Sequence, residues 1–226
     1  MRDIYHEDLD SLSDSLVEMT RLVAGAMGRA TQALIDADVQ LADNVIASDD
    51  TVDALRADIE SRAFDILARQ QPVASDLRTL IATLRMVTDL ERSGDLAEHI
   101  AEVARRRYPN SAVPASVRAI VLEMGQVSER IIAKAGSVVA TRDIVAAREI
   151  ERDDDVMDDL HRKMLRTIFG GSWAEGVECA VDVALLGRYY ERYSDHAVSV
   201  ARSVIYLVTG EVPEPEAVGA SGSASS

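Results

Sequence analysis

The feature that most constrains the fold is an internal repeat in the sequence. A shift of 105 positions superposes the first part of the chain on its second half, and a shift of 100 positions does so further on. The superposed pairs are Met19 with Met124, Asp38 with Asp143, Asp49 with Asp154, Asp53 with Asp158, Glu91 with Glu191 and Asp95 with Asp195. Two copies of one structural unit are therefore expected. We assign residues 1–108 to the first repeat, residues 109–210 to the second and residues 211–226 to a tail.

Each repeat has the pattern of three helices. In the first repeat, apolar residues spaced three and four apart predict helices over 6–36, 39–70 and 73–107. Asp38 and its repeat mate Asp143 are expected to cap the N-termini of the second helices. Pro72 suits the first turn of the third helix. Short connections make successive helices antiparallel, so the predicted fold is all-α, with two tandem three-helix bundles and six long helices.

The charge balance excludes several classes of protein. The chain has 24 Lys and Arg against 39 Asp and Glu, a net charge of −15. This acidity argues against nucleic-acid binding, which needs a basic surface. No apolar run reaches the roughly 20 residues that span a bilayer, and the start lacks a signal peptide. We therefore expect a cytoplasmic protein without membrane insertion. The tail is rich in Pro, Glu, Ser and Gly, which predicts disorder.

Acidic side chains replace the apolar stripe of the third helix in both repeats. The heptad stripe Leu77, Leu80, Ile81, Leu84 and Val87 continues into Glu91, Gly94 and Asp95. The second repeat continues in the same way into Glu191, Ser194 and Asp195. In both copies a small residue lies between the two acids. Carboxylates at core-side positions indicate a site rather than packing.

The second helix carries a matching acidic pair. Asp49 and Asp53 are four apart, so they share one helix face, as do Asp154 and Asp158 in the second repeat. With the turn near residue 71, Asp49 lies 22 residues before it, and Glu91 lies 20 residues after it. Antiparallel helices therefore place these acids at the same height. The sequence predicts one cluster of at least four carboxylates in each repeat.

Crowded carboxylates protonate, pair with arginine or hold a cation. Oxygen ligands suit hard cations such as iron, Mn²⁺, Mg²⁺ or Ca²⁺, so we predict one carboxylate metal site in each repeat. Arg78, Arg85 and Arg92 recur every seven residues beside Glu91, and they could neutralise the acids without metal or bind an anion. His161 and His196 could ligate a metal in the second site, although ordinary packed or surface histidines are the simpler interpretation.

The sequence resembles the PhoU family of bacterial phosphate-transport accessory proteins. The resemblance rests on the two three-helix repeats, on Gln71-Pro72-Val73-Ala74-Ser75-Asp76-Leu77-Arg78, and on Asp89-Leu90-Glu91-Arg92-Ser93-Gly94-Asp95. The opening Tyr5-His6-Glu7-Asp8-Leu9-Asp10 is similar to the actinobacterial form. The resemblance covers residues 1–210.

The resemblance implies a cytosolic, often dimeric protein that binds metal clusters and represses the phosphate-starvation response. It implies two partners, the ATPase subunit of the phosphate ABC transporter and the membrane-bound sensor histidine kinase of the phosphate regulon. The family's metal motif maps onto Asp49, Asp53, Glu91 and Asp95, and onto Asp154, Asp158, Glu191 and Asp195. The second copy departs from the family pattern because it lacks the Gln-Pro stretch and has a Tyr-rich context.

Three hypotheses remain open for the function. The leading one is a non-enzymatic adaptor that binds metal and represses phosphate signalling. A second is a carboxylate-bridged di-iron enzyme, which is disfavoured because ferritin-like sites use Glu-x-x-His pairs and the chain has only Asp158-x-x-His161. A third is a helical scaffold without metal. The sequence has no glycine-rich phosphate loop and no activated nucleophile, so we predict no enzymatic activity.

Overall fold

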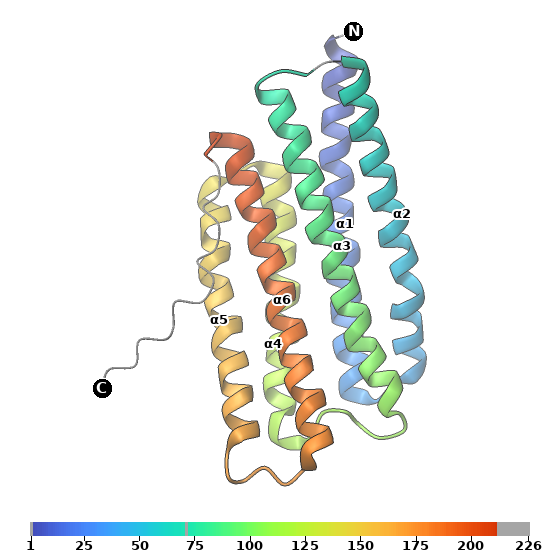
Figure 1. Ribbon diagram of the computed structural model, residues 1–226, viewed down its shortest axis with the longest axis vertical. Coiled ribbons are helices and arrows are strands. Elements are labelled where there is room, and N and C mark those ends of the chain that lie inside the picture. Colours follow the sequence, from blue (N-terminus) through green and yellow to red (C-terminus); the bar gives the residue numbers. More distant parts are fainter. Residues whose placement is uncertain (1, 71, 212–226) are drawn as a thin grey trace, which may run out of the picture.

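A computed structural model describes residues 2–70 and 72–211 of the chain, and within them every regular element is a helix. The six helices are α1 (Arg2–Asp36), α2 (Val39–Gln70), α3 (Ser75–Arg107), α4 (Ala115–Thr141), α5 (Ile144–Phe169) and α6 (Gly176–Thr209). Successive helices run antiparallel (Figure 1). The predicted all-α fold with six long helices is confirmed. The predicted disorder of the tail concerns residues that lie, apart from Glu211, outside the described part of the chain.

The sequence predicts N-caps for α2 and α5 and a first-turn proline for α3, and the helix starts test these predictions. The Asp143 carboxylate accepts hydrogen bonds from the backbone N–H groups of Val145 and Ala146, at 2.8 and 3.1 Å, and Asp38 does the same for α2. Both predicted N-caps are confirmed. The prediction for Pro72 is wrong, because α3 begins only at Ser75. Ala74, which lies between Pro72 and Ser75, has a φ of 50°. This left-handed conformation separates Pro72 from the first turn of α3.

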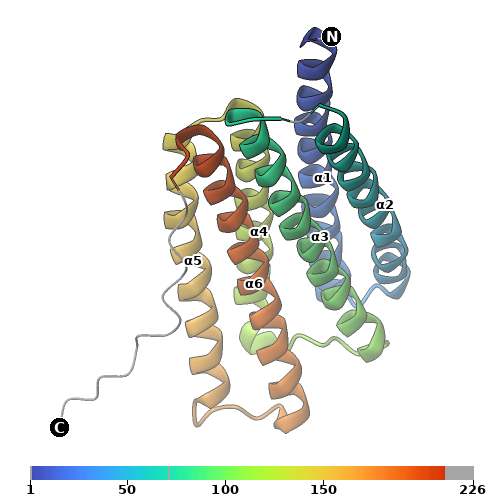
Figure 2. The ribbon, with the colours of Figure 1, turned by 45° about the horizontal axis from the view of Figure 1, so that its top comes forward.

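The two repeats form three-helix bundles that pack side by side. Helices α1, α2 and α3 form one bundle and α4, α5 and α6 the other (Figures 1 and 2). The bundles meet where α1 packs against α4 and α3 packs against α6, which leaves α2 and α5 on the outer flanks. The buried apolar side chains form one continuous core through both bundles. The repeats are therefore sequence units that share a single core.

Small residues let α1 and α4 approach closely. A Cβ placed on Gly125 would overlap the Thr31 side chain, with its Cβ at 3.1 Å, and a Cβ on Gly136 would overlap Thr20 in the same way. The shift of 105 makes Gly125 the repeat mate of Thr20 and Gly136 the mate of Thr31. Thr31 therefore contacts the repeat mate of Thr20, and Thr20 contacts the repeat mate of Thr31. This exchange is the signature of an approximate two-fold axis between the repeats.

Polar contacts complete the seam between the bundles. The Tyr190 and Thr31 hydroxyls, both buried, lie 2.8 Å apart. The His196 Nδ1 lies 3.1 Å from Asp89 Oδ1. At the end of α3, Arg106 and Arg107 form ion pairs with the buried Asp182 of α6. None of the helices described here is both long enough and apolar enough to cross a bilayer.

Candidate functional site

The first acidic cluster lies between α2 and α3, where Asp49 faces Gly94. A Cβ placed on Gly94 would lie 2.9 Å from Asp49 Oδ1 and 3.3 Å from Val52 Cγ1. Any larger residue at position 94 would therefore move the carboxylate or separate the two helices. Glycine is required here for a close approach rather than for a special backbone angle.

Electrostatics show that the predicted acids of the first repeat come together. The pKa of Asp49 is raised to about 6, first by burial and then by the neighbouring carboxylates of Glu98, Asp95, Asp53 and Glu91, in that order. The pKa of Glu91 is also raised, first by burial and then by Asp95. Asp49 and Asp53 of α2 thus lie at the same height as Glu91 and Asp95 of α3, as predicted from their distances to the turn. Asp53 is exposed at the rim, whereas Asp49, Glu91 and Asp95 are half-buried.

Glu98 also belongs to this cluster, although it is not among the residues predicted from the sequence. Glu98 ranks first among the charges that raise the pKa of Asp49. Its own pKa is raised by burial and by the neighbouring Glu102. The available signal was its spacing, because Glu98 follows Glu91 by seven residues and so shares its helix face. The repeat mate of Glu98 is Val198, which is buried, so the second repeat has no equivalent carboxylate.

An arginine of α2, which is not among the residues predicted from the sequence, neutralises part of the negative charge of the first cluster. Arg56 of α2 forms ion pairs with Glu91 and with Glu60, the latter at 3.1 Å. The Arg78, Arg85 and Arg92 row lies elsewhere on α3. The Arg85 guanidinium stands 5.3 Å from the ring centroid of Tyr206 in α6. The alternative in which this row neutralises the acids is therefore wrong.

The second acidic cluster lies between α5 and α6 and repeats the first. The pKa of Asp154 is raised to about 6, mainly by burial; the Ser194 hydroxyl opposes this rise, whereas Asp195, Asp158 and Asp155 add to it. Burial also raises the pKa of Glu191, which is ion-paired with Arg188 of its own helix. The four predicted residues of this repeat are thus brought together.

Two buried oxygens of the second cluster are unsatisfied. Asp154 Oδ1 and Ser194 Oγ have no hydrogen-bond partner of good geometry among the described residues. Ser194 therefore influences the Asp154 carboxylate from nearby without forming a well-aligned bond to it. An unpaired buried carboxylate oxygen costs free energy, and it would gain from a cation or a bound water.

The two histidines named in the sequence analysis lie in different surroundings. His196 points to Asp89 across the seam between the bundles, so it holds α3 to α6. His161 of α5 packs against α6, with its Cδ2 3.1 Å from the position of a Cβ on Gly187. Burial and the nearby Arg188 lower the pKa of His161, and Asp158 raises it. His161 is the histidine that lies near the second cluster.

The donor chemistry of both clusters suits a hard cation, because each offers carboxylate oxygens and no thiolate. However, no group of three or more His, Cys, Asp or Glu side chains in residues 2–70 and 72–211 is arranged to enclose a metal ion. In each cluster the glutamate that would have to coordinate the metal is paired with an arginine instead, Glu91 with Arg56 and Glu191 with Arg188. Metal binding at these residues stays a prediction, and it would require these side chains to turn.

The architecture defines a class of protein: a tandem repeat of a three-helix unit, six helices in all, with one acidic cluster in each repeat. The family model for the PhoU domain matches twice, over residues 16–104 and 121–204. The chain therefore belongs to the PhoU family, and the resemblance drawn from the sequence is confirmed. The second match begins and ends within the second repeat, as the internal repeat requires.

Curated relatives match over nearly their whole length. The chain is 47% identical over 213 residues to the phosphate-specific transport system accessory protein PhoU homolog 2 of Mycobacterium tuberculosis, which covers 94% of this chain and 100% of the relative. It is 45% identical over 218 residues to PhoU homolog 1 of Mycobacterium leprae, which covers 96% and 98%. Both relatives are named as accessory proteins of phosphate-specific transport.

Solved structures agree with the fold. The crystal structure of PhoU from Pseudomonas aeruginosa is similar with a TM-score of 0.82 and 30% sequence identity, over 92% of this chain and 100% of that one. The phosphate transport regulatory protein PhoU from Streptococcus pneumoniae gives a TM-score of 0.83 at 23% identity, which bears on the fold alone.

Proposed function

We propose that the protein is a cytoplasmic negative regulator of the phosphate-starvation response and of phosphate uptake. The observation that carries this proposal is the full-length similarity to accessory proteins of phosphate-specific transport, at 47% identity to the Mycobacterium tuberculosis relative. In this proposal the protein acts through contacts with partners and has no turnover of its own. The long helical scaffold without a nucleotide loop supports that role.

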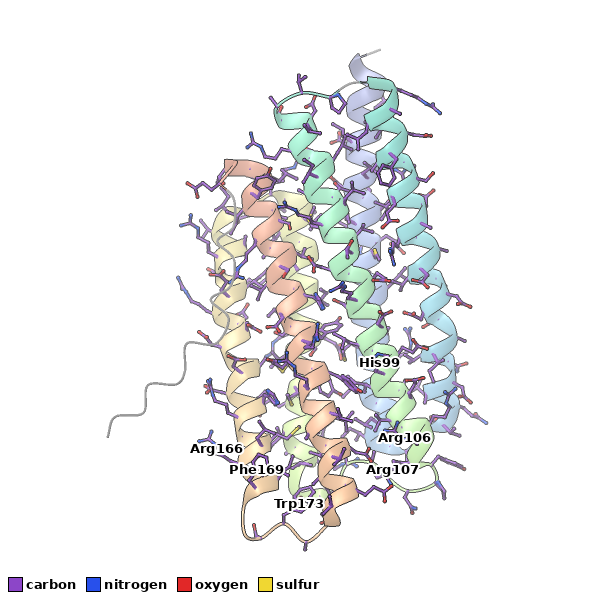
Figure 3. All side chains as sticks on the ribbon, in the orientation of Figure 1. His99, Arg106, Arg107, Arg166, Phe169 and Trp173 are labelled. Carbon is purple, nitrogen blue, oxygen red and sulfur yellow. The ribbon has the colours of Figure 1, made fainter. Side chains whose placement is uncertain are left out.

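The proposed partners are the ATPase subunit of the phosphate ABC transporter and the sensor histidine kinase of the phosphate regulon. The α2–α3 and α5–α6 turns lie at opposite ends of the molecule (Figure 1), and Phe169 lies next to the second of them (Figure 3). Exposed apolar side chains near both turns support an adaptor with two contact surfaces. Phe64 and Val73 are 59% and 73% exposed near the α2–α3 turn, and Phe169 and Val177 are each 81% exposed near the α5–α6 turn. Such side chains are typical anchors of protein interfaces. The same surfaces could also serve a homodimer, which we include in the proposal.

We further propose that each acidic cluster binds a hard metal ion, namely iron, manganese, magnesium or calcium. The ligands would be Asp49, Asp53, Glu91 and Asp95 in the first repeat and Asp154, Asp158, Glu191 and Asp195 in the second. A cation would neutralise carboxylates whose pKa values are raised by burial and by one another. The buried, unsatisfied Asp154 Oδ1 supports the second site independently.

The regulatory proposal is tested by deleting the gene in its own bacterium. We expect phosphate-scavenging genes to be expressed when phosphate is plentiful, and the wild-type gene to restore their repression. Any second gene of the same family must also be deleted, because it could compensate. Normal phosphate control in the strain without either gene would contradict the proposal.

The metal proposal is tested on protein purified without chelator. The double variant Glu91→Ala with Asp95→Ala should lose the metal of the first site and keep that of the second, so the bound metal per chain should fall by about half. The matched control is Asp43→Ala with Asp50→Ala, because these two exposed carboxylates of α2 lie outside the cluster. Circular dichroism must show unchanged helicity. Equal metal content in the wild type and the cluster variant would contradict the assignment.

A further inference from the structure

The only two phenylalanines of the chain are repeat mates, and both are exposed. A shift of 105 positions superposes Phe64 of α2 on Phe169, the last residue of α5. Both side chains are more than half exposed to solvent. Large apolar side chains are mostly buried in folded proteins. Their exposure at the same position of both repeats therefore indicates a contact surface in each repeat.

Exposed side chains of α6 lie beside Phe169. They are four residues apart and form one line along the helix, namely Val177, Val181 and Leu185. His161 of α5 packs against Gly187 of α6, so in this antiparallel pair Phe169, eight residues after His161, lies opposite residue 179. At 3.6 residues per turn it is rotated from His161 by only about 80°, and so it borders α6. We call Phe169 and the three residues of the line the α5–α6 surface.

The charges around the two phenylalanines differ. Residues 57–69, around Phe64, have three acidic and two basic side chains. Their repeat mates, residues 162–174 around Phe169, have three basic side chains and no acidic one. Both basic side chains of the first set are ion-paired within α2, at 2.9 and 3.3 Å. The surroundings of Phe64 are therefore compensated, whereas those of Phe169 are basic.

Two of the three basic residues beside Phe169 have no acidic partner. Arg162 pairs with Asp159 at 2.7 Å. Within residues 2–70 and 72–211, neither Lys163 nor Arg166 takes part in an ion pair, and the Arg166 Nε donates a 3.3 Å hydrogen bond to the backbone oxygen of Arg162. The register of α5 against α6 places Lys163 and Arg166 at the level of residues 185 and 182, next to the apolar line.

The structure of α5 itself explains only part of this charge. A basic side chain in the last turn of a helix interacts favourably with the helix dipole, and Arg166 lies in the last turn of α5. Lys163 lies before that turn, and the dipole gives no reason for an exposed aromatic ring. Acidic residues follow only at the start of α6, where Glu178 pairs with Arg107 at 2.8 Å. One further carboxylate, Glu175, does not cancel two free cations.

Hydrogen bonds hold the turn beside this surface in place. The Trp173 Nε1–H donates to the backbone oxygen of Gly176 at 2.9 Å, and the Trp173 backbone N–H donates to that of Gly170 at 3.1 Å. A surface that is ordered before binding loses little conformational entropy when a partner docks. The α5–α6 surface is therefore preorganised.

The size of the surface favours a short partner segment over a second copy of the chain. A stable protein interface buries roughly 800 Å² on each partner, whereas four partly exposed side chains present a few hundred square ångströms. The line on α6 covers eight residues, or about 12 Å, which is the length of two helical turns. An amphipathic helix covers such a line with apolar side chains three and four residues apart.

We propose that the α5–α6 surface binds an amphipathic helix of a partner protein that carries acidic residues beside its apolar face. This inference rests on the proposed role of the turn surfaces in partner binding, and it adds the chemistry of one partner. The apolar face covers Phe169 and the line on α6, and acidic side chains one turn apart pair with Lys163 and Arg166. The surface at Phe64 has no free basic residue beside it, so the two surfaces select different partners.

The test selects binders from a random library of peptides of about 16 residues displayed on phage. The full chain is the bait, and the Phe169→Ser variant serves for counter-selection. We expect the enriched peptides to combine apolar residues three or four apart with Asp or Glu. A chain with a net charge of −15 attracts basic peptides non-specifically, so enrichment of acidic ones requires a local basic surface. Enrichment without an acidic preference, or no enrichment that depends on Phe169, would overturn the proposal.

An enriched peptide with a fluorescent label then tests the individual residues by fluorescence anisotropy. Phe169→Ser should weaken binding at least about tenfold, and so should Lys163→Glu with Arg166→Glu. The matched control is Phe64→Ser, at the equivalent exposed position of the first repeat, and it should leave the affinity unchanged. Circular dichroism must show that each variant is folded. Equal losses in the Phe64 and Phe169 variants, or an unchanged affinity in the charge variant, would overturn the proposal.

Two further measurements exclude other occupants of the surface. Sedimentation velocity compares the wild type with Phe169→Ser, and a dimer lost in the variant would assign the surface to a second copy. Flotation with phosphatidylcholine–phosphatidylserine vesicles that depends on Phe169 would assign it to a membrane. Either result would overturn the proposal, whereas an unchanged mass and no flotation support it. None of these readouts involves phosphate control, so the gene deletion decides the regulatory proposal separately.

Discussion

Replacing Asp49 by asparagine should stabilise the metal-free protein. Asp49 is the carboxylate of the first cluster whose pKa is raised to about 6, because it is partly buried and faces Glu98, Asp95, Asp53 and Glu91. Asparagine has nearly the same shape and fits against Gly94 in the same way. The variant removes the negative charge of Asp49, which is less favourable in the folded state than in the unfolded state.

The magnitude follows from the shift in pKa. A rise from 3.8 to about 6 corresponds to at most about 3 kcal/mol between the folded and unfolded states. Asp49 is only half-buried, so solvent screening reduces this to about 1 kcal/mol. For a chain of this size, such a gain raises the melting temperature by about 2–4 °C.

The pH dependence has a defined sign. Because the folded-state pKa of Asp49 lies above its unfolded value, the folded state binds the proton more tightly. The contribution to stability is fully present below pH 3.8 and is lost as the pH rises through about 6. Asp49→Asn should therefore have little effect at pH 4 and its full stabilising effect at pH 7.5.

The assay is urea unfolding followed by circular dichroism, with chelator, at both pH values. Asp50→Asn is the matched control, since it removes the same charge from the neighbouring exposed position. A stabilisation of Asp49→Asn at pH 7.5 that exceeds that of the control supports the reasoning. Equal effects of the two variants, or a loss of stability at pH 7.5, would refute it.

A bound cation should make the wild type more stable than Asp49→Asn, which is the reverse of the order expected without metal. A ligand that binds only the folded state stabilises it in proportion to the logarithm of its concentration. The wild type should gain stability when the cation is added, whereas Asp49→Asn should gain less because it has lost a ligand. If both proteins respond equally to every hard cation tested, Asp49 is not a metal ligand.

Two further predictions concern the seam and the core. Tyr190→Phe should destabilise the protein by about 1–2 kcal/mol, because it leaves the buried Thr31 hydroxyl without its partner. Tyr193→Phe should be neutral or stabilising, since the buried Tyr193 hydroxyl has no partner among the described residues; urea unfolding of both variants checks the opposite signs. Gly136→Ala should destabilise by about 1–3 kcal/mol because its methyl group overlaps Thr20. Thr20→Ala in the same chain should restore part of the loss, and a double-mutant cycle without coupling would contradict the contact.

The sequence was sufficient for the architecture and for the position of the clusters. The repeat shifts and the apolar periodicity predict six helices, and the antiparallel register brings Asp49 to the height of Glu91. These predictions succeed because they depend on spacing along regular helices. The start of α3 could not be predicted in the same way, since it depends on the left-handed backbone of Ala74.

Charge compensation could not be predicted, because it depends on which side chains meet across helices. The repeat mate of Arg56 is His161, whose pKa is lowered by burial. A neutral imidazole cannot neutralise Glu191, and Arg188 of α6 forms that ion pair instead. Of the arginines that the sequence suggested, Arg85 stands over the Tyr206 ring of α6 instead. Spacing shows which residues share a face, but it does not show which partner a long flexible side chain chooses.

The positions of the two clusters separate their chemistry from the seam between the bundles. Each cluster lies between an outer helix and an inner one, α2 with α3 and α5 with α6, and Gly94 and Ser194 occupy the contact points. The seam between the bundles rests instead on the packing of α1 with α4 and of α3 with α6. Close threonine–glycine contacts join α1 to α4, and the Tyr190–Thr31 hydrogen bond joins α6 to α1. Neutralising a cluster therefore relieves the repulsion between carboxylates of an outer helix and its inner neighbour, and none of these carboxylates takes part in the seam contacts named here. Phe64 and Phe169 are exposed on the same outer helices, so each surface proposed to contact a partner shares a helix with one acidic cluster.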